Sequence, residues 1–140
     1  MSEKENHIIK ETFTSAVQNH QKNNFKIAES LYEKILKINP NHLESIFLLG
    51  TLFAQTKKFD KAKQLFDKVI EKQPNHKEAH NNLGNVLKEL GELQRAISCY
   101  KEAVQISPNY ADAHNNLGTV YQELGKYMEA FFSYQKSILI

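Results

Sequence analysis

The sequence repeats itself every 34 residues. The hexapeptide AHNNLG begins at residue 79 and returns at residue 113. Proline followed by asparagine recurs with the same spacing, at positions 40–41, 74–75 and 108–109. Alanine recurs at positions 28, 62, 96 and 130, and glycine at 50, 84 and 118. Self-similarity at a period of this length is typical of a solenoid, in which each repeat packs only against its neighbours.

Two helices are expected in each repeat. Apolar residues follow helical spacing over 83–90 and again over 93–106, with a break at Gly91. Gly125 stands at the corresponding break in the next repeat, while the first two repeats have Asn23 and Lys57 there. Glycine and asparagine tolerate the left-handed conformation that ends a helix better than lysine does. The turn at Lys57-Lys58 therefore fits the expected turn chemistry least well.

The proline-asparagine pairs separate one repeat from the next. Proline disfavours helix in the residue before it, so it ends the second helix of a repeat. The following asparagine is then placed to cap the next helix, and each has an acid three residues later, as in a capping box. The predicted pairs are Asn41 with Glu44, Asn75 with Glu78, and Asn109 with Asp112.

Small and aromatic residues recur at positions that indicate close helix packing. The small residues Ala16, Gly50, Gly84 and Gly118 would let the two helices of a hairpin approach each other. The aromatic residues recur 34 apart and are expected to fill the layer between successive hairpins: Tyr32, Phe66, Tyr100 and Tyr134. We interpret both sets as structural.

This pattern of Leu-Gly, alanine, aromatic, alanine and proline over 34 positions resembles the tetratricopeptide repeat. The resemblance covers nearly the whole chain, in units 9–42, 43–76, 77–110 and 111–140 after an N-terminal extension of residues 1–8. The first unit has Ser15-Ala16 in place of Leu-Gly. The tryptophan of the family's fourth position is replaced throughout, by Thr12, Ile46, His80 and His114. The resemblance implies a single all-α domain, a right-handed α-solenoid of about four stacked hairpins whose first helices line a concave groove.

Asparagines are concentrated at positions that the resemblance assigns to this groove: Asn81, Asn82, Asn85, Asn115 and Asn116. An asparagine amide offers a donor and an acceptor, which match the peptide group of an extended chain. Asn82 and Asn116 occupy positions similar to those of the asparagine ladder in O-linked N-acetylglucosamine transferases. The alternative is that these asparagines satisfy nearby backbone groups. Thr14 and Leu48 at the matching positions exclude a ladder along the whole groove.

The N-terminal half of the predicted groove is apolar. Phe13 and Phe47 stand at matching positions and would suit an aliphatic or aromatic anchor of a bound peptide. They could equally be core residues where the first repeat packs on the second. A peptide ligand would thus meet amides in one half of the groove and aromatic rings in the other.

Composition excludes several function classes. The 18 basic and 16 acidic residues are mixed along the chain, so nucleic acid and membrane surfaces are not expected partners. The single cysteine, Cys99, has no zinc-like spacing of Cys or His around it, and no metal or other cofactor is expected. No nucleophile with an adjacent base and no phosphate loop is present, so an enzyme is not expected. The absence of a signal peptide or long apolar segment favours the cytoplasm.

The final segment, FFSYQKSILI, contains apolar residues where a solenoid normally has a polar capping helix. The residues expected to form an exposed assembly surface are Phe131, Phe132, Ile138, Leu139 and Ile140, with Tyr134 beside them. A truncated last unit of a longer protein, a homodimer through this helix, and a docking surface each account for the pattern. We favour the first explanation.

These observations give three functional hypotheses. The leading one is a protein-protein interaction module that binds a peptide or protein segment in its groove and forms part of a longer protein. The second is the substrate-recognition arm of an enzyme such as a glycosyltransferase. The third is a structural scaffold that assembles through the C-terminal helix.

Overall fold

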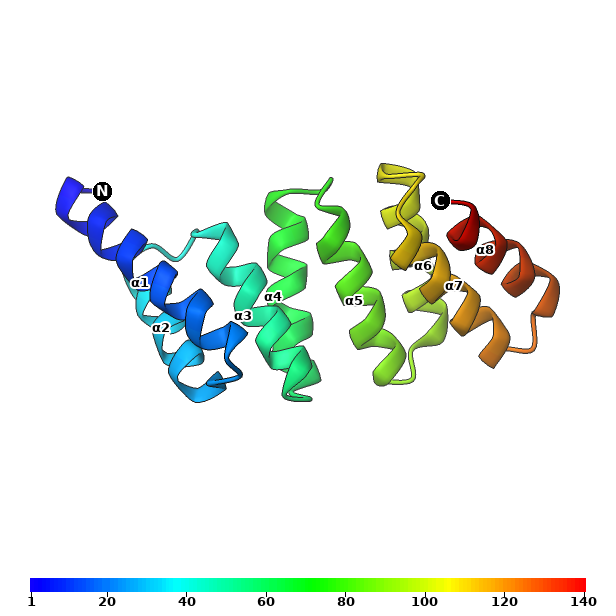
Figure 1. Ribbon diagram of the computed structural model, residues 1–140, viewed down its shortest axis with the longest axis horizontal. Helices are drawn as coiled ribbons and strands as arrows, with labels where there is room; N and C mark the ends of the chain where they lie inside the picture. Colours follow the sequence, from blue (N-terminus) through cyan, green and yellow to red (C-terminus); the bar gives the residue numbers. More distant parts are fainter. The chain divides into compact units, whose positions relative to one another are not determined.

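The computed structural model describes all 140 residues and contains eight α-helices and no strand (Figure 1). The helices are α1 (Glu3–Gln21), α2 (Phe25–Ile38), α3 (Leu43–Gln55), α4 (Phe59–Lys72), α5 (Lys77–Glu89), α6 (Leu93–Ile106), α7 (Ala111–Glu123) and α8 (Tyr127–Leu139). The all-α repeat architecture predicted from the sequence is confirmed. The chain forms two compact units, Met1–Leu65 and Phe66–Ile140, and the division falls within α4.

In the first unit, α1 packs on α2, and α2 packs on α3. Ala16 of α1, Tyr32 of α2 and Ile46 of α3 are fully buried between these helices. Residues 3–8, which the repeat register left as an extension, continue α1. Ser2 caps this helix by accepting a hydrogen bond from the Glu5 backbone N–H at 3.1 Å.

In the second unit, α5 packs on α6, α6 on α7, and α7 on α8. The two first helices, α5 and α7, also contact each other. Leu87, Tyr100 and Val120 contribute buried apolar side chains from three of these helices. The direct contact of α5 with α7 joins their outward side chains into one surface, where the candidate site lies.

All four hairpin turns use one left-handed residue at the predicted position. The φ angles are 62° at Asn23, 62° at Lys57, 80° at Gly91 and 73° at Gly125. At the second turn, the Lys57 N–H donates to the Ala54 carbonyl at 3.1 Å, and the next N–H donates to Phe53 at 2.7 Å. This bonding is that of a Schellman motif. The turn with the least suitable residue therefore has the same geometry as the others.

The predicted helix caps are wrong by one residue. The N-caps of α3, α5 and α7 are His42, His76 and Tyr110, not the asparagine that follows each proline. The His76 Nδ1 accepts from the Ala79 N–H at 3.1 Å, and the His42 Nδ1 lies 3.3 Å from the Ser45 nitrogen. The asparagine lies inside the turn and is exposed. The imidazole of the following histidine reaches the free helix N–H in α3 and α5, whereas Tyr110 makes no side-chain cap bond in α7.

The small and aromatic positions pack against each other directly. A Cβ atom added to Gly84 would lie 2.5 Å from Cε1 of Tyr100, and one added to Gly118 would lie 2.6 Å from Tyr134. Close helix packing at these glycines is therefore confirmed. The aromatic ring contacts the first helix of its own hairpin, however, whereas the sequence spacing predicted only a position between hairpins.

Candidate functional site

The asparagines of α5 and α7 divide into those that bond to the protein and those that do not. Asn81 is only 5% exposed, and its Oδ1 accepts a hydrogen bond from Nδ2 of Asn116 at 3.0 Å. The Asn81 side chain also lies close enough to the Tyr110 hydroxyl to lower the pKa of that group. Asn81 and Asn116 therefore join α5 to α7. The sequence pattern placed both residues in the groove and did not predict a bond between them.

Asn85 stabilises the hairpin core. Its Oδ1 accepts a hydrogen bond from the hydroxyl of Tyr100, whose side chain is completely buried. A buried hydroxyl needs such a partner, because leaving it unpaired costs about 1 to 3 kcal/mol. The carbonyl oxygen of the Asn85 side chain is thus bonded to the Tyr100 hydroxyl of α6, and only its amide nitrogen remains for other contacts.

Asn82 and Asn115 have side chains without a hydrogen-bond partner in the protein. Asn82 is half-buried, and Asn115 is exposed. Each amide therefore offers a full donor and acceptor set to a ligand. Asn116, also half-buried, retains its carbonyl oxygen after donating to Asn81. The surface of α5 and α7 therefore has two side-chain amides without a partner in the protein, Asn82 and Asn115, next to Asn116, whose orientation is fixed by its bond to Asn81.

Burial raises the pKa of three groups in this unit, Cys99, Tyr100 and Tyr110. It raises the pKa of the Tyr110 hydroxyl, with smaller contributions from Glu78 and Asp112, and the Asn81 side chain opposes the shift. Burial also raises the pKa of the Cys99 thiol to about 11. Cys99 therefore stays protonated at neutral pH, which does not suit a nucleophile.

The histidines that replace the family's tryptophan are structural. His80 and His114 are buried, and the Nε2–H of each donates to the carbonyl of the proline six residues earlier, Pro74 or Pro108, at 2.8 Å. Each histidine thus ties a first helix to the turn that precedes it. No group of three or more His, Cys, Asp or Glu side chains in residues 1–140 could hold a metal ion.

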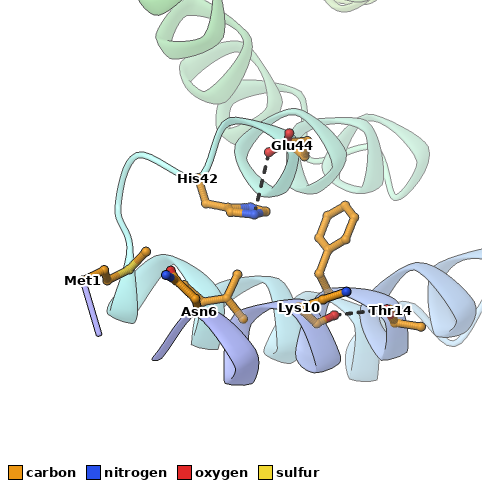
Figure 2. A pocket seen from close by; sticks show the side chains of 8 residues that line it. Met1, Asn6, Lys10, Thr14, His42 and Glu44 are labelled. Carbon is orange, nitrogen blue, oxygen red and sulfur yellow. Dashed lines mark hydrogen bonds and ion pairs between the residues drawn. The ribbon is translucent and has the colours of Figure 1, made fainter. Parts of the chain in front are cut away.

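The first unit has a pocket of about 510 Å³ beside Phe13 (Figure 2). Its lining residues are Met1, Asn6, Ile9, Lys10, Phe13, Thr14, His42 and Glu44. The edge of the Phe13 ring meets the His42 ring with centroids 5.4 Å apart, and His42 Nε2 lies 3.7 Å from a Glu44 oxygen. Figure 2 shows this imidazole across from the side chains of α1. The pocket lining thus combines apolar side chains (Met1, Ile9, Phe13) with two charged ones (Lys10, Glu44).

Sequence reasoning predicted Phe13 but missed His42. The signal was present, because a histidine follows proline-asparagine at both 42 and 76. Capping by the imidazole fixes His42 beside Phe13, which forms one side of the pocket. Phe47 of α3 is half-buried, and its contact with a ligand remains a prediction.

The C-terminal helix has the exposed apolar surface expected from the sequence. Phe131, Phe132, Ile138, Leu139 and Ile140 are all more than half exposed. Tyr134 differs from them, because its ring packs on Gly118 and its hydroxyl donates to Gln122 Oε1 at 2.9 Å. Tyr134 is therefore part of the hairpin rather than of the exposed surface.

Three family models match the chain. The one described as "TPR repeat" matches residues 84–125, "Tetratricopeptide repeat" matches 111–140, and "Anaphase-promoting complex, cyclosome, subunit 3" matches 21–103, more than half of the chain. No curated protein sequence matches it. None of the helices is both long and apolar enough to span a membrane.

Solved structures of two kinds are similar to the chain. A crystal structure of MamA is 30% identical with a TM-score of 0.83, over 89% of this chain and 73% of that one. MamA from Desulfovibrio magneticus RS-1 is 19% identical, with a TM-score of 0.88, over 93% of this chain and 73% of that one. An O-GlcNAc transferase mutant from Thermobaculum terrenum is 26% identical, with a TM-score of 0.80. That similarity covers 86% of this chain but only 23% of the transferase.

Proposed function

Because the chain belongs to the tetratricopeptide repeat family, we propose that it is a non-catalytic interaction module that binds an extended polypeptide segment on the surface of α5 and α7. The observation that carries this proposal is the pair of uncommitted amides, Asn82 and Asn115, next to the Asn81–Asn116 hydrogen bond. We further propose that the module acts in the cytoplasm.

The arrangement is suited to holding a peptide backbone. Asn82 and Asn115 can each donate to a ligand carbonyl and accept from a ligand N–H, and Asn116 adds a carbonyl oxygen whose orientation is set by Asn81. Each hydrogen bond contributes only about 0.5 to 1.5 kcal/mol net, so affinity requires several bonds or an additional apolar contact. An amide fixed before binding loses less conformational entropy when the ligand arrives.

The pocket beside Phe13 could supply an apolar contact in the first unit. A cavity of about 510 Å³ accommodates a large aliphatic or aromatic side chain, and the Phe13 ring is half-buried at its wall. The Lys10 ammonium and the Glu44 carboxylate both line this pocket, so a charged neighbour of either sign in the ligand would find an opposite charge. Phe47 is proposed as a second apolar contact of this kind.

A selection from a phage-displayed library of random peptides tests the amide surface. Peptides that bind the wild-type chain are measured against an N82A/N115A variant and against a Q94A/Q105A control, which removes two exposed amides from α6 instead. We expect the control to retain binding and the N82A/N115A variant to lose most of it. Equal binding by all three proteins, with unchanged circular dichroism, would refute the proposed surface.

A second candidate function rests on the similarity to the transferase. The 26% identity extends over 86% of this chain, and the asparagine ladder of such transferases resembles the placing of Asn82 and Asn116 in this sequence. On this alternative, the module is the substrate-recognition arm of a glycosyltransferase. An immunoblot of source cells with an antibody to this module, followed by sequencing of the detected product, tests it. A product with a sugar-nucleotide-binding domain supports this alternative, and one without it leaves only the interaction module.

A further inference from the structure

The outer face of α8 differs from the same face of the other second helices. Met128, Phe132 and Leu139 are 64%, 53% and 78% exposed. The residues 34, 68 and 102 positions earlier are polar and exposed in every repeat: Lys26, Asp60 and Gln94; Ser30, Gln64 and Ser98; Lys37, Glu71 and Gln105. We call Met128, Phe132 and Leu139 the α8 stripe. Apolar residues replace polar ones at three equivalent positions on one helix face.

A following hairpin would not cover the α8 stripe. The second helix α2 packs on α3, and α6 packs on α7, yet the equivalent residues of both α2 and α6 remain exposed. The residue that stacking buries is different: Ile97 of α6, which corresponds to Phe131 of α8. The stripe therefore needs a partner other than the next repeat, whatever sequence follows Ile140.

The spacing within the stripe is that of a coiled-coil seam. Met128, Phe132, Gln135 and Leu139 are separated by four, three and four residues, as are d and a positions of a heptad repeat. Gln135 is also exposed. One polar residue in such a seam lowers stability but restricts the register of the two helices. A second helix with the same seam is thus a suitable partner.

The charged residues of α8 determine whether such a helix pair is parallel or antiparallel. Glu129 and Lys136 are exposed, seven residues apart on the same flank of the stripe. In a parallel pair these e positions would lie beside g positions of the partner helix, and the g positions within α8, Phe131 and Ile138, carry no charge. An antiparallel pair would place Glu129 of one chain beside Lys136 of the other, twice in a symmetric dimer. The helix is therefore complementary to itself only when antiparallel.

We propose that the α8 stripe pairs with the α8 stripe of a second copy of this chain, as an antiparallel helix pair with a two-fold axis. The contact leaves the α5 and α7 surface of each copy free, so it is independent of the peptide-binding role proposed above. Such a dimer would present two binding surfaces, which increases the apparent affinity for a partner that has two target segments.

Sedimentation equilibrium of the full chain over about 1 to 200 µM tests the proposal, because small interfaces associate in this range. The variant M128Q/F132S/L139Q carries the residues of α6 at the same three positions, so each is compatible with an exposed helix face. We expect the wild type to dimerise and this variant to stay monomeric. The control F131Q/I138Q lowers the hydrophobicity of the stacking side of α8 instead, and we expect it to dimerise.

A charge-reversal pair tests the direction of the helices. E129K places a second ammonium group beside Lys136 at both ends of an antiparallel dimer, and we expect the dissociation constant to rise roughly ten-fold at low salt. The double variant E129K/K136E should restore dimerisation. A monomeric wild type, loss of dimerisation in the stacking-side control alone, or no change with E129K would each overturn the proposal. Flotation of a monomeric wild type with phosphatidylcholine and phosphatidylglycerol vesicles would assign the stripe to a lipid surface instead.

Discussion

Alanine substitutions should separate the asparagines that stabilise the second unit from those that are free to bind. In Asn116→Ala, the Oδ1 of Asn81 loses the donor that lies 3.0 Å away, while its side chain stays only 5% exposed. A buried polar group left without a partner costs about 1 to 3 kcal/mol. In Asn82→Ala, no hydrogen bond within the protein is lost, so the change should stay within about 0.5 kcal/mol.

The pair can be tested with a double-mutant cycle. Asn81→Ala alone should cost at least as much as Asn116→Ala, because it removes the acceptor of this bond, a nearly fully buried side chain and the contact with the Tyr110 hydroxyl. The N81A/N116A variant should then be more stable than the sum of the single changes predicts, by about 1 kcal/mol. This coupling energy measures the α5–α7 hydrogen bond apart from the packing of either side chain.

Urea denaturation followed by circular dichroism at 222 nm gives the free energy of unfolding for each variant, and hydrogen exchange of the α5 and α7 amides locates the change within the second unit. A loss of 1 kcal/mol corresponds to a fall of roughly 2 to 4 °C in Tm for a chain of this size. If Asn116→Ala is as stable as Asn82→Ala, or if the coupling energy is zero, the assignment of Asn81 and Asn116 to the structure is wrong.

Three further changes have expected outcomes from the structure. Lys57→Gly should raise the free energy of unfolding by about 0.5 to 1 kcal/mol, measured by urea denaturation. Glycine removes the cost of the left-handed conformation at φ 62°, and this gain exceeds the entropy that glycine adds to the unfolded chain. An unchanged or lower free energy of unfolding would contradict this reasoning. Gly84→Ala should lower Tm despite the better helix propensity of alanine, since its Cβ would lie 2.5 Å from the buried Tyr100 ring, and overpacking of this kind costs about 1 to 3 kcal/mol. Burial raises the Cys99 pKa to about 11, so iodoacetamide at pH 8 should modify the folded chain roughly 100-fold more slowly than the urea-unfolded chain. Equal rates would show that the thiol is not shielded.

The repeat period determined the helices and their turns because both depend on local chemistry that recurs. Apolar spacing predicted a hairpin in each unit, and the left-handed positions were found at 23, 57, 91 and 125. Lys57 shows that a repeat can impose this geometry on a residue that disfavours it. The neighbouring helices supply packing energy that exceeds the roughly 1 to 2 kcal/mol cost of that conformation.

The caps and the asparagine partners could not be derived in the same way. Several side chains near the start of a helix can accept its free N–H groups, and the position of the backbone decided for His42 over Asn41. An asparagine amide likewise has several potential partners at similar energy. Whether Asn85 bonds a ligand or Tyr100 depends on distances of less than an ångström, which residue spacing does not give.

The same repeat logic identifies Asn82 as the residue on which peptide binding should depend most. Asn116 bonds to Asn81, the first asparagine of the preceding AHNNLG motif. Asn82, the second asparagine of that preceding motif, is half-buried and makes no side-chain hydrogen bond within the protein. Asn115 also makes no such bond but is exposed, so water competes more strongly for its amide than for that of half-buried Asn82. We therefore expect Asn82→Ala alone to raise the Kd for a selected peptide by about five-fold or more, the equivalent of one lost hydrogen bond. Isothermal titration of the single variants would contradict this order if Asn115→Ala weakened binding while Asn82→Ala did not.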